Sequence, residues 1–379
     1  MRCPFCRTLD TKRKGTTGTA PTGLTGVGKP LQRFWCHACR RSFTIARRTS
    51  STRSRFSSDV VHQAVTDYVE GLGSYRMLAR TYSRRLSRDV SRSALNAWVA
   101  AAGAAAMTPL EMSRRLAPPG WGGWVGIDGK RLRIGSGDEA TLMVAVDQTS
   151  TDLIHARVVD HESGDVFAHM LMDLVQIGYP LAGVVADLGS GPPRESFPQA
   201  CADYFGDLPF QACRVHFARR MDQLLSTPRH QPDAGPNAEL KQAIRDILFA
   251  PSYQTAVDAY HRVTTDTTRY TSRPARTILR SLRRTIALHL THHQHRGLPA
   301  DANITENVVR TLNRKLAPME HCATRATTDH YTRLLAANYR WKRFTDSSNG
   351  RNGHSPLELA GVTLPTDHWL PYLQQTHST

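Results

Sequence analysis

The chain has 379 residues, of which 40% are hydrophobic and 21% charged, so it fits two or three folded domains and excludes a wholly disordered protein. The 49 Lys and Arg against 32 Asp and Glu leave a net charge of +17, which makes nucleic acid the first expected partner. No apolar stretch can cross a bilayer and the polar N-terminus does not resemble a signal peptide. We therefore expect a soluble, cytoplasmic protein with no membrane partner.

Four of the seven cysteines lie in residues 1–50, in two Cys-x-x-Cys pairs: Cys3 with Cys6, and Cys36 with Cys39. Each pair presents two thiolates on one side of a turn, and two pairs supply the four ligands of a tetrahedral Zn²⁺ site. The alternative, a pair of disulfides, fits poorly because nothing indicates secretion. We expect one structural Zn²⁺ in a zinc-binding module over residues 1–50, whose folding depends on the metal.

Three short helices are predicted in residues 55–107. Apolar residues recur at spacings of three and four over 60–69, Ser74 can cap a second helix, and a third begins near Ser91 or Ser93. The expected DNA-binding residues are Arg76, Arg80, Arg84, Arg85 and Arg92. We interpret the region as a helix-turn-helix whose last helix reads the major groove. A plain three-helix bundle with solvated arginines remains the alternative.

The pattern changes to strands after a Pro/Gly-rich linker, over residues 121–216. The expected elements are strands at 124–134, 141–147 and 153–159, a helix at 164–178, and a fourth strand at 182–187. Three consecutive strands, a helix and a strand form the opening order of the RNase H-like α/β fold. In that arrangement the first and fourth strands can lie side by side.

Two aspartates stand out in these strands. Asp128 lies in the first strand and Asp187 ends the fourth, so their carboxylates are expected to converge. Such a pair suits Mg²⁺, and two Mg²⁺ ions activate a nucleophile and stabilise the leaving oxygen in phosphoryl transfer. Either aspartate can instead cap a turn. Asp147, which closes the second strand, competes for the role.

Motifs are spread over most of the chain. They are Gly-Ile-Asp-Gly-Lys around Asp128, Val-Val-Ala-Asp-Leu-Gly around Asp187, Cys-Arg-Val-His at 213–216, the segment Asn303–Leu316 and the segment His354–Gly361. Together they resemble the DDE transposases of bacterial insertion sequences, on the side related to mutator-like elements. The resemblance implies an RNase H-like catalytic domain in which three acids bind two Mg²⁺ ions, with Mn²⁺ as a substitute.

The same resemblance implies a partner and a place of action. The partner is double-stranded DNA, both the element ends and the target, which the protein cleaves and joins. A homodimer or higher oligomer is expected because two ends must be brought together. The protein would act in the prokaryotic cytoplasm, associated with the nucleoid when bound to DNA.

The resemblance places the third acid on a helix beyond the second aspartate. Asn303-x-x-Glu306 resembles the Asn-x-x-Glu of the family, so Glu306 takes this role. The same residues also fit a capping box, with Asn303 as the N-cap. A different alignment puts Arg310 at the position of the acid, and Glu320 is a weaker reserve.

A Cys-x-x-His motif precedes a long helical stretch. Cys213 and His216 match a motif of mutator-like catalytic domains, and we expect His216 near the active centre, where it contacts DNA or positions a phosphate. Residues 217–300 have helical periodicity and are expected to form an all-α insertion that carries DNA or dimer contacts, or acts as a lid. The catalytic domain resumes over 301–345, and 346–379 is a C-terminal tail.

Two further segments combine polar and aromatic residues. Histidines gather at positions 289, 292, 293 and 295, and we interpret them as contacts to a helix dipole or DNA rather than as a metal site. The segment Tyr339–Phe344 alternates aromatics with cations. We favour a last helix that buries Tyr339 and Phe344 and leaves its basic face in solvent, over a surface that binds phosphate and stacks bases.

These observations predict a transposase of an insertion sequence. The main alternative is a DNA-binding regulator with a zinc module, a helix-turn-helix and an inactive nuclease-like domain. A nuclease or resolvase on the same fold is a second alternative.

Overall fold

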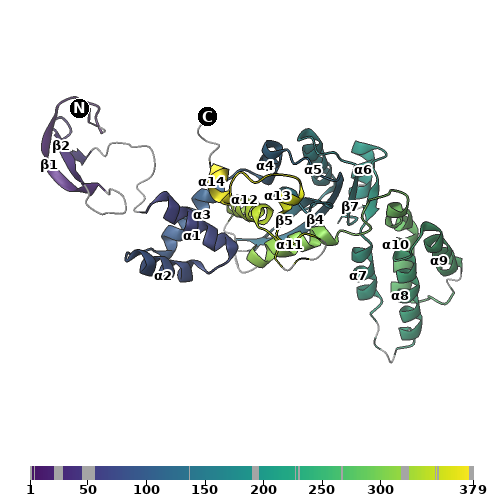
Figure 1. Cartoon of the computed structure of the whole chain (residues 1–379). Coiled ribbons are helices and arrows are strands. Elements are labelled where there is room, and N and C mark those ends of the chain that lie inside the picture. Colours follow the sequence, from purple (N-terminus) through teal and green to yellow (C-terminus); the bar gives the residue numbers. More distant parts are fainter. Residues whose placement is uncertain are drawn as a thin grey trace. The chain divides into compact units, whose positions relative to one another are not determined.

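The computed structural model describes residues 2–374 except 4, 21–28, 45–55, 136, 190–195, 227, 229–230, 266–267, 317–323, 346 and 348–349. The chain divides into two compact units, Met1–Tyr68 with Gly73–Trp98, and Val69–Leu72 with Val99–Thr379. Both α-helices and β-sheets are present, so the protein is of the mixed α/β class (Figure 1). Among the described residues, no helix has the length and apolar character needed to span a membrane.

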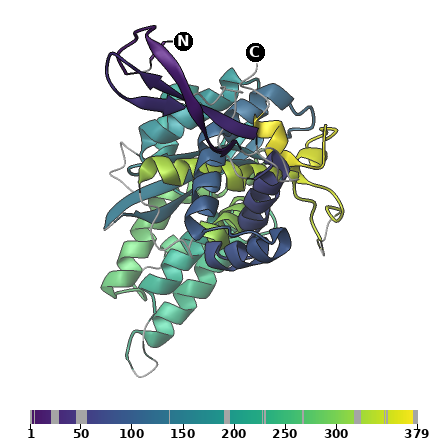
Figure 2. The same ribbon diagram turned by 90° about the vertical axis from the view of Figure 1, so that its left-hand side faces the viewer.

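A small antiparallel sheet lies at the N-terminus. Its order is β1 (Thr11–Ala20), β2 (Lys29–Cys36) and β3 (Ser42–Thr44), with the long β1–β2 hairpin visible in purple in Figure 2. Its hydrophobic cluster holds Phe34 stacked on Phe43, with ring centroids 5.8 Å apart, beside the buried Cys3 and Cys36. So small a core supplies little folding energy, in agreement with a module that depends on a cross-link or a metal.

Three helices follow as predicted: α1 (Ser58–Glu70), α2 (Tyr75–Leu86) and α3 (Arg92–Ala105). The Ser74 hydroxyl accepts a hydrogen bond from the Met77 amide and caps α2, and Ser91 does the same for α3. Between α1 and α2, the buried Tyr82 hydroxyl donates to Asp67 Oδ2 over 2.8 Å. The sequence prediction of three short capped helices is therefore confirmed.

The central sheet has five strands. They are β4 (Trp124–Ile134), β5 (Asp138–Asp147), β6 (Leu153–Val159), β7 (Gly183–Ala186) and β8 (Phe210–Ala212), in the spatial order β6-β5-β4-β7-β8. The first three strands pair antiparallel, whereas β7 and β8 join parallel to β4. The parallel connections run through α5 (Gly164–Gln176) and α6 (Phe197–Phe205). The predicted neighbourhood of the first and fourth strands is confirmed, since Ile127 lies opposite Ala186.

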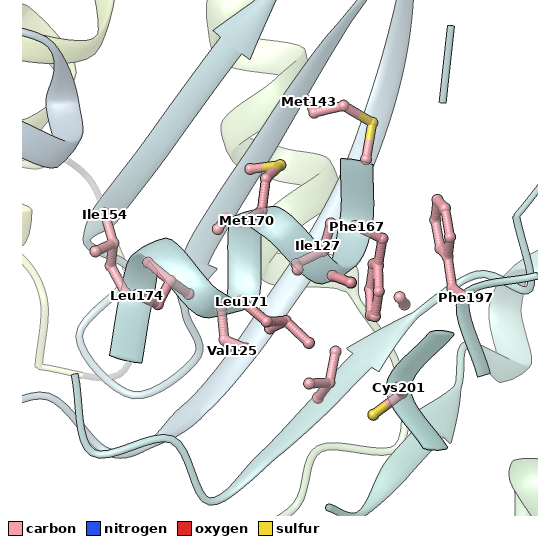
Figure 3. Close-up of a cluster of buried hydrophobic side chains, with 14 of the residues drawn as sticks. Val125, Ile127, Met143, Ile154, Phe167, Met170, Leu171, Leu174, Phe197 and Cys201 are labelled. Carbon is pink, nitrogen blue, oxygen red and sulfur yellow. The ribbon is translucent and has the colours of Figure 1, made fainter. Parts of the chain in front are cut away.

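One face of this sheet packs against α5 and α6. Figure 3 shows Phe167, Met170 and Leu171 of α5 beside Val125 and Ile127 of β4, all of them fully buried. Each such side chain contributes about 1.5–3 kcal/mol when removed from water, so this layer holds α5 and α6 against the sheet. The alternate residues of β4, among them Gly126 and Asp128, face the opposite side.

The opposite face is covered by α11 (Asn303–Leu316), which packs on β4 and β5, while α12 (Arg325–Trp341) packs against β6 and α11 (Figure 1). Shorter helices complete this unit, namely α4 (Pro109–Leu116), α13 (Pro356–Leu359) and α14 (Trp369–Gln374). Helix α4 packs against β6, and its buried Ser113 hydroxyl donates to the Ile154 carbonyl over 2.9 Å.

The helical stretch between β8 and α11 forms a group of its own. It contains α7 (Arg214–Leu224), α8 (Ala234–Leu248), α9 (Tyr253–Thr265), α10 (Arg273–His289) and the 3₁₀ turn η2 (Thr291–His293). The helices pack side by side around a separate core that includes Leu240, Ile244 and Leu282 (Figures 1 and 2).

The histidines at the end of α10 correct one prediction. His289 is buried with Nδ1 3.1 Å from the Ala212 carbonyl, and Gln211 accepts from the His292 amide over 2.8 Å. Burial lowers the pKa of both His289 and His292 to about 4, so both are neutral. The expected contact with a helix dipole or DNA is therefore wrong for the buried His289, which instead fastens α10 to β8, and the His292 amide fastens η2 to the same strand.

The interpretation of Tyr339–Phe344 also needs correction. Arg340 is not solvated: its side chain is fully buried, and Nε and Nη2 each lie 2.7 Å from an oxygen of the equally buried Asp152. Arg340 Nη1 also donates to the Pro109 carbonyl, and the Trp121 indole donates to Asp152. The neighbouring Lys342 and Arg343 are exposed as expected. The basic residues are thus divided between the core and the surface, because the buried Asp152 carboxylate, in the turn between β5 and β6, needs a cation beside it.

We expect Arg340→Met to lower the free energy of unfolding by about 3–5 kcal/mol, because it leaves the Asp152 carboxylate buried without its cation. Arg343→Met is the matched control, since Arg343 pairs with Glu358 at the surface and should change stability little. Urea denaturation followed by tryptophan fluorescence measures both. Equal losses in the two variants would contradict this assignment.

Candidate functional site

Asp128 and Asp187 are brought together by the pairing of β4 with β7. The parallel register runs from Trp124 opposite Gly183 to Ile127 opposite Ala186, so the two aspartates are the next residues on adjacent strands. One oxygen of Asp128 accepts from the Gly129 amide, and one oxygen of Asp187 accepts from the Gly189 amide. Burial, helped by the charges of Asp187 and Glu306, raises the pKa of Asp128 to about 6. Clustered acids of this kind are what a divalent cation neutralises.

Asp147, the competing candidate, has a structural role. It is fully buried and accepts hydrogen bonds from the Gly122 amide, the Ser150 amide and hydroxyl, and the Tyr179 hydroxyl. It lies opposite Val125, three residues before Asp128 along β4. With its oxygens occupied by the turn that joins β5 to β6, it is not available as a metal ligand.

The first turn of α11 lies directly on β4 beside Asp128. A Cβ added at Gly126 would be 2.0 Å from Thr305 Oγ1 and 2.2 Å from Gln148 Nε2, so only glycine permits this approach. Gln148 Nε2 in turn donates to Thr305 Oγ1 over 2.8 Å and to the Val146 carbonyl over 3.1 Å. Because Glu306 follows Thr305, this contact brings the third predicted acid to the face of the sheet that carries Asp128.

The carboxylate of Glu306 contacts α7. Its oxygens lie 3.4 Å from His216 Nε2 and 2.8 Å from Arg219 Nη1. The ligand atoms of Cys213, His216 and Glu306 lie within 4.8 Å of one another, and within the described part of the chain Asp128, Asp187 and Glu306 do not form such a group. In this structure the Glu306 carboxylate is therefore bound by two side chains of α7. It does not form a metal-binding group with Asp128 and Asp187.

The alternative reading of Asn303 and Glu306 as a capping box is wrong. Asn303 is the first residue of α11, and the Glu306 amide bonds to the Ala302 carbonyl in the ordinary helical pattern. The Asn303 amide donates to Asp301 Oδ1 over 3.3 Å and not to Glu306. The Glu306 carboxylate is thus free of the cap.

Cys213 and His216 lie at the junction of β8 and α7. The Cys213 amide donates to the Ala186 carbonyl over 2.7 Å, which fixes this residue beside the end of β7. The adjacent Cys213 sulfur raises the pKa of His216 to about 9, and the carboxylates of Asp128 and Glu306 act in the same direction against the effect of burial. His216 accordingly carries a positive charge next to the acids at neutral pH.

The other two candidates for the third acid are not at this place. Arg310 is exposed one turn further along α11, where it donates to the Asn307 side chain. Glu320 lies outside the described residues.

Arg219, which sequence reasoning missed, is the second side chain that holds Glu306. Its position three residues after His216 places both on one face of α7, a spacing that could have revealed it.

The four N-terminal cysteines converge. Their sulfurs lie within 4.8 Å of one another, with 3.6 Å between Cys3 and Cys39 and 3.5 Å between Cys6 and Cys36. The residue after each pair, Arg7 and Arg40, has a positive φ, 60° and 53°. Both knuckles thus make the same tight turn, and four thiolates converging from two such turns fit a metal ion such as Zn²⁺.

The predicted DNA-binding arginines are all exposed on α2 and at the start of α3. Among the described residues none of the five takes part in an ion pair. Beside Arg92, a hollow of about 330 Å³ is lined by Tyr75, Ser93 and Asn96. From the sequence Ser93 was considered only as a possible helix start and Asn96 was not singled out, because a polar residue on an exposed helix face is ordinary.

We expect Gly126→Ala to push α11 away from β4 and to lower the free energy of unfolding by about 1–3 kcal/mol, through overpacking. Hydrogen exchange at the amides of the first turn of α11 should accelerate. The control is Gly235→Ala in α8, where the added Cβ meets nothing within 4 Å. Unchanged exchange in Gly126→Ala would show that α11 does not need this close contact.

Comparison with known proteins places the chain. Among curated proteins none matches. Of the solved structures that match, the strand transfer complex of the Drosophila P element transposase has 10% sequence identity and a TM-score of 0.45, covering 77% of this chain and 94% of that one. The family model described as transposase, Mutator family, matches residues 50–344, which is most of the chain. The resemblance seen in the sequence motifs is thus confirmed, and the chain belongs to the Mutator family of transposases.

Proposed function

We propose that this transposase cleaves DNA strands and transfers them, with Asp128, Asp187 and Glu306 as ligands of two Mg²⁺ ions. The observation that carries the proposal is the meeting of Asp128 and Asp187 at the ends of adjacent parallel strands, with the first turn of α11 on the same face. Three antiparallel strands, a crossover helix and two parallel strands support assigning the sheet to the RNase H-like fold. The catalytic domain would comprise residues 121–216 and 301–345 around the 217–300 insertion.

The donor set fits hard divalent cations, since carboxylate oxygens are the ligands that Mg²⁺ prefers and Mn²⁺ accepts. Bound there, the two ions would activate the attacking oxygen and stabilise the leaving oxygen. The protein's own part is to hold Asp128 and Asp187 in place through amide hydrogen bonds and to release Glu306 from Arg219. His216, positively charged beside the acids, positions a DNA phosphate.

The N-terminal parts would select the DNA. Zn²⁺ bound by Cys3, Cys6, Cys36 and Cys39 orders the small sheet of residues 1–50. Helices α1–α3 would form a helix-turn-helix, in which Arg92, Ser93 and Asn96 of α3 face base edges and the arginines of α2 contact phosphates. Because both ends of an element must be joined, the working form would be a homodimer or a larger oligomer, on the DNA of a prokaryotic cytoplasm.

We expect Asp128→Asn to abolish excision and integration of a reporter that carries the flanking DNA of the gene. The change keeps the size of the side chain and removes a charge that a metal ligand needs. Asp147→Asn does not serve as a control because it breaks buried hydrogen bonds. Asp160→Asn does, since Asp160 is exposed and pairs with Arg325 at the surface.

The possible results separate the candidate functions. Movement of DNA by wild type and by Asp160→Asn, but not by Asp128→Asn, supports the proposal. If neither wild type nor any variant moves DNA while wild type still binds the flanks, the protein is a DNA-binding regulator with an inactive nuclease-like domain. If Asp128→Asn moves DNA as well as wild type, the site is misassigned.

We expect Cys36→Ser to remove the bound Zn²⁺ and to unfold residues 1–44, because four cysteines and a very small core hold this sheet together. Metal analysis of the purified protein should find one Zn²⁺ per wild-type chain and none in the variant. Cys201→Ser, at a buried cysteine of α6 that is not part of this cluster, is the control and should keep the Zn²⁺. One Zn²⁺ per chain in Cys36→Ser would place the metal elsewhere.

A further inference from the structure

Helix α10 has one strongly basic face. Its five arginines are Arg273, Arg276, Arg280, Arg283 and Arg284, and all are exposed. At 100° per residue they fall within a sector of about 100°, opposite the buried Ala275, Ile278 and Leu282. The helix contains no acidic residue. Its outer face is therefore a single row of guanidinium groups.

Within the part of the chain that the structure describes, the row has no acidic partners. None of the ion pairs among the described residues involves an arginine of α10. Other arginines of the same helical group are paired: Arg245 with Asp222 at 2.6 Å and Arg269 with Glu239 at 2.5 Å. Arg283 donates to the Thr264 carbonyl. The other four arginines of the row lie on one face with no acid among the described residues to offset their charge, which favours a polyanionic partner.

The surroundings of the row favour a phosphate backbone over a protein surface. A protein interface has an apolar centre, whereas the row is flanked on one side by the polar residues Thr277 and Ser281. Guanidinium groups bind phosphate through two parallel hydrogen bonds. From Arg273 to Arg284 the helix rises about 16 Å, which matches about four or five phosphates along one strand of a duplex.

We propose that the exposed face of α10 is a second DNA-binding surface, which holds the backbone of duplex DNA independently of its sequence. The inference deepens the proposed function and depends on it, since it names a contact for the same DNA. The C-terminal end of α10 is fastened to the sheet through His289 and Gln211, so the row runs outward from the sheet that carries the two aspartates. DNA held along it is tied to the catalytic unit itself, and not only to α1–α3.

The test compares two double variants of the full-length protein that lose the same charge. Arg276→Gln with Arg280→Gln removes two members of the row. Lys241→Gln with Arg262→Gln removes two cations of α8 and α9 that take part in no described ion pair. Binding of a fluorescein-labelled duplex of random sequence is followed by anisotropy over a range of NaCl concentrations. Circular dichroism checks that each variant is folded.

For the α10 pair we expect the slope of log K against log[NaCl] to fall by about 2, because each phosphate contact contributes about 0.9. The control pair should keep the wild-type slope. Equal reductions in both pairs would assign the effect to net charge, and an unchanged slope in the α10 pair would make the row a solvated face. Either result overturns the inference and leaves the proposed function standing. A wild-type protein that does not bind duplex DNA would refute both.

Discussion

The close contact between α11 and β4 at Gly126 is the constraint on which the arrangement of the acids depends. Asp128 and Asp187 meet through ordinary strand pairing, but Glu306 comes from a helix that follows the α7–α10 group in sequence. A side chain at position 126 would occupy the space of Thr305 and Gln148 and lift that helix from the sheet. The absence of one methyl group thus lets Glu306, 178 positions after Asp128 in the sequence, lie on the face of the sheet that carries Asp128.

Two groups of buried charged residues in this protein differ in how their charges are balanced. Around Arg340 and Asp152 every charge is neutralised within the core, so the group only stabilises. Around Asp128 the acids are left close together, and the cations nearby, His216 and Arg219, belong to α7. The second group costs folding energy in the absence of a ligand. The two cations pair with Glu306, whereas Asp128 and Asp187 take part in no described ion pair, and the pKa of Asp128 is raised. Acids perturbed in this way are typical of binding and catalytic sites, which is the physical reason to propose the chemistry there.

Much of the central sheet could be predicted from the sequence, because β4 alternates, β5 and β6 are apolar runs separated by a turn, and α5 has clear helical spacing. Strand β8 was not predicted, since three buried residues leave no period to detect, and α4 has only eight residues. Local pattern likewise could not show that Arg340 is buried, because its partner is 188 residues away. For Glu306 the motif found the residue, but only the packing of α7 shows which side chains hold it.

The separation between Asp152 and Arg340 bears on how a newly made chain matures. The turn between β5 and β6 leaves the ribosome early, with a carboxylate that is meant to be buried, while the guanidinium that neutralises it is made near the end of translation. Until then this part of the core stays hydrated, since an unpaired charge resists burial. A truncated product lacking α12 would therefore leave the Asp152 carboxylate without its cation beside Trp121, and this part of the core would close only once residue 340 has been added.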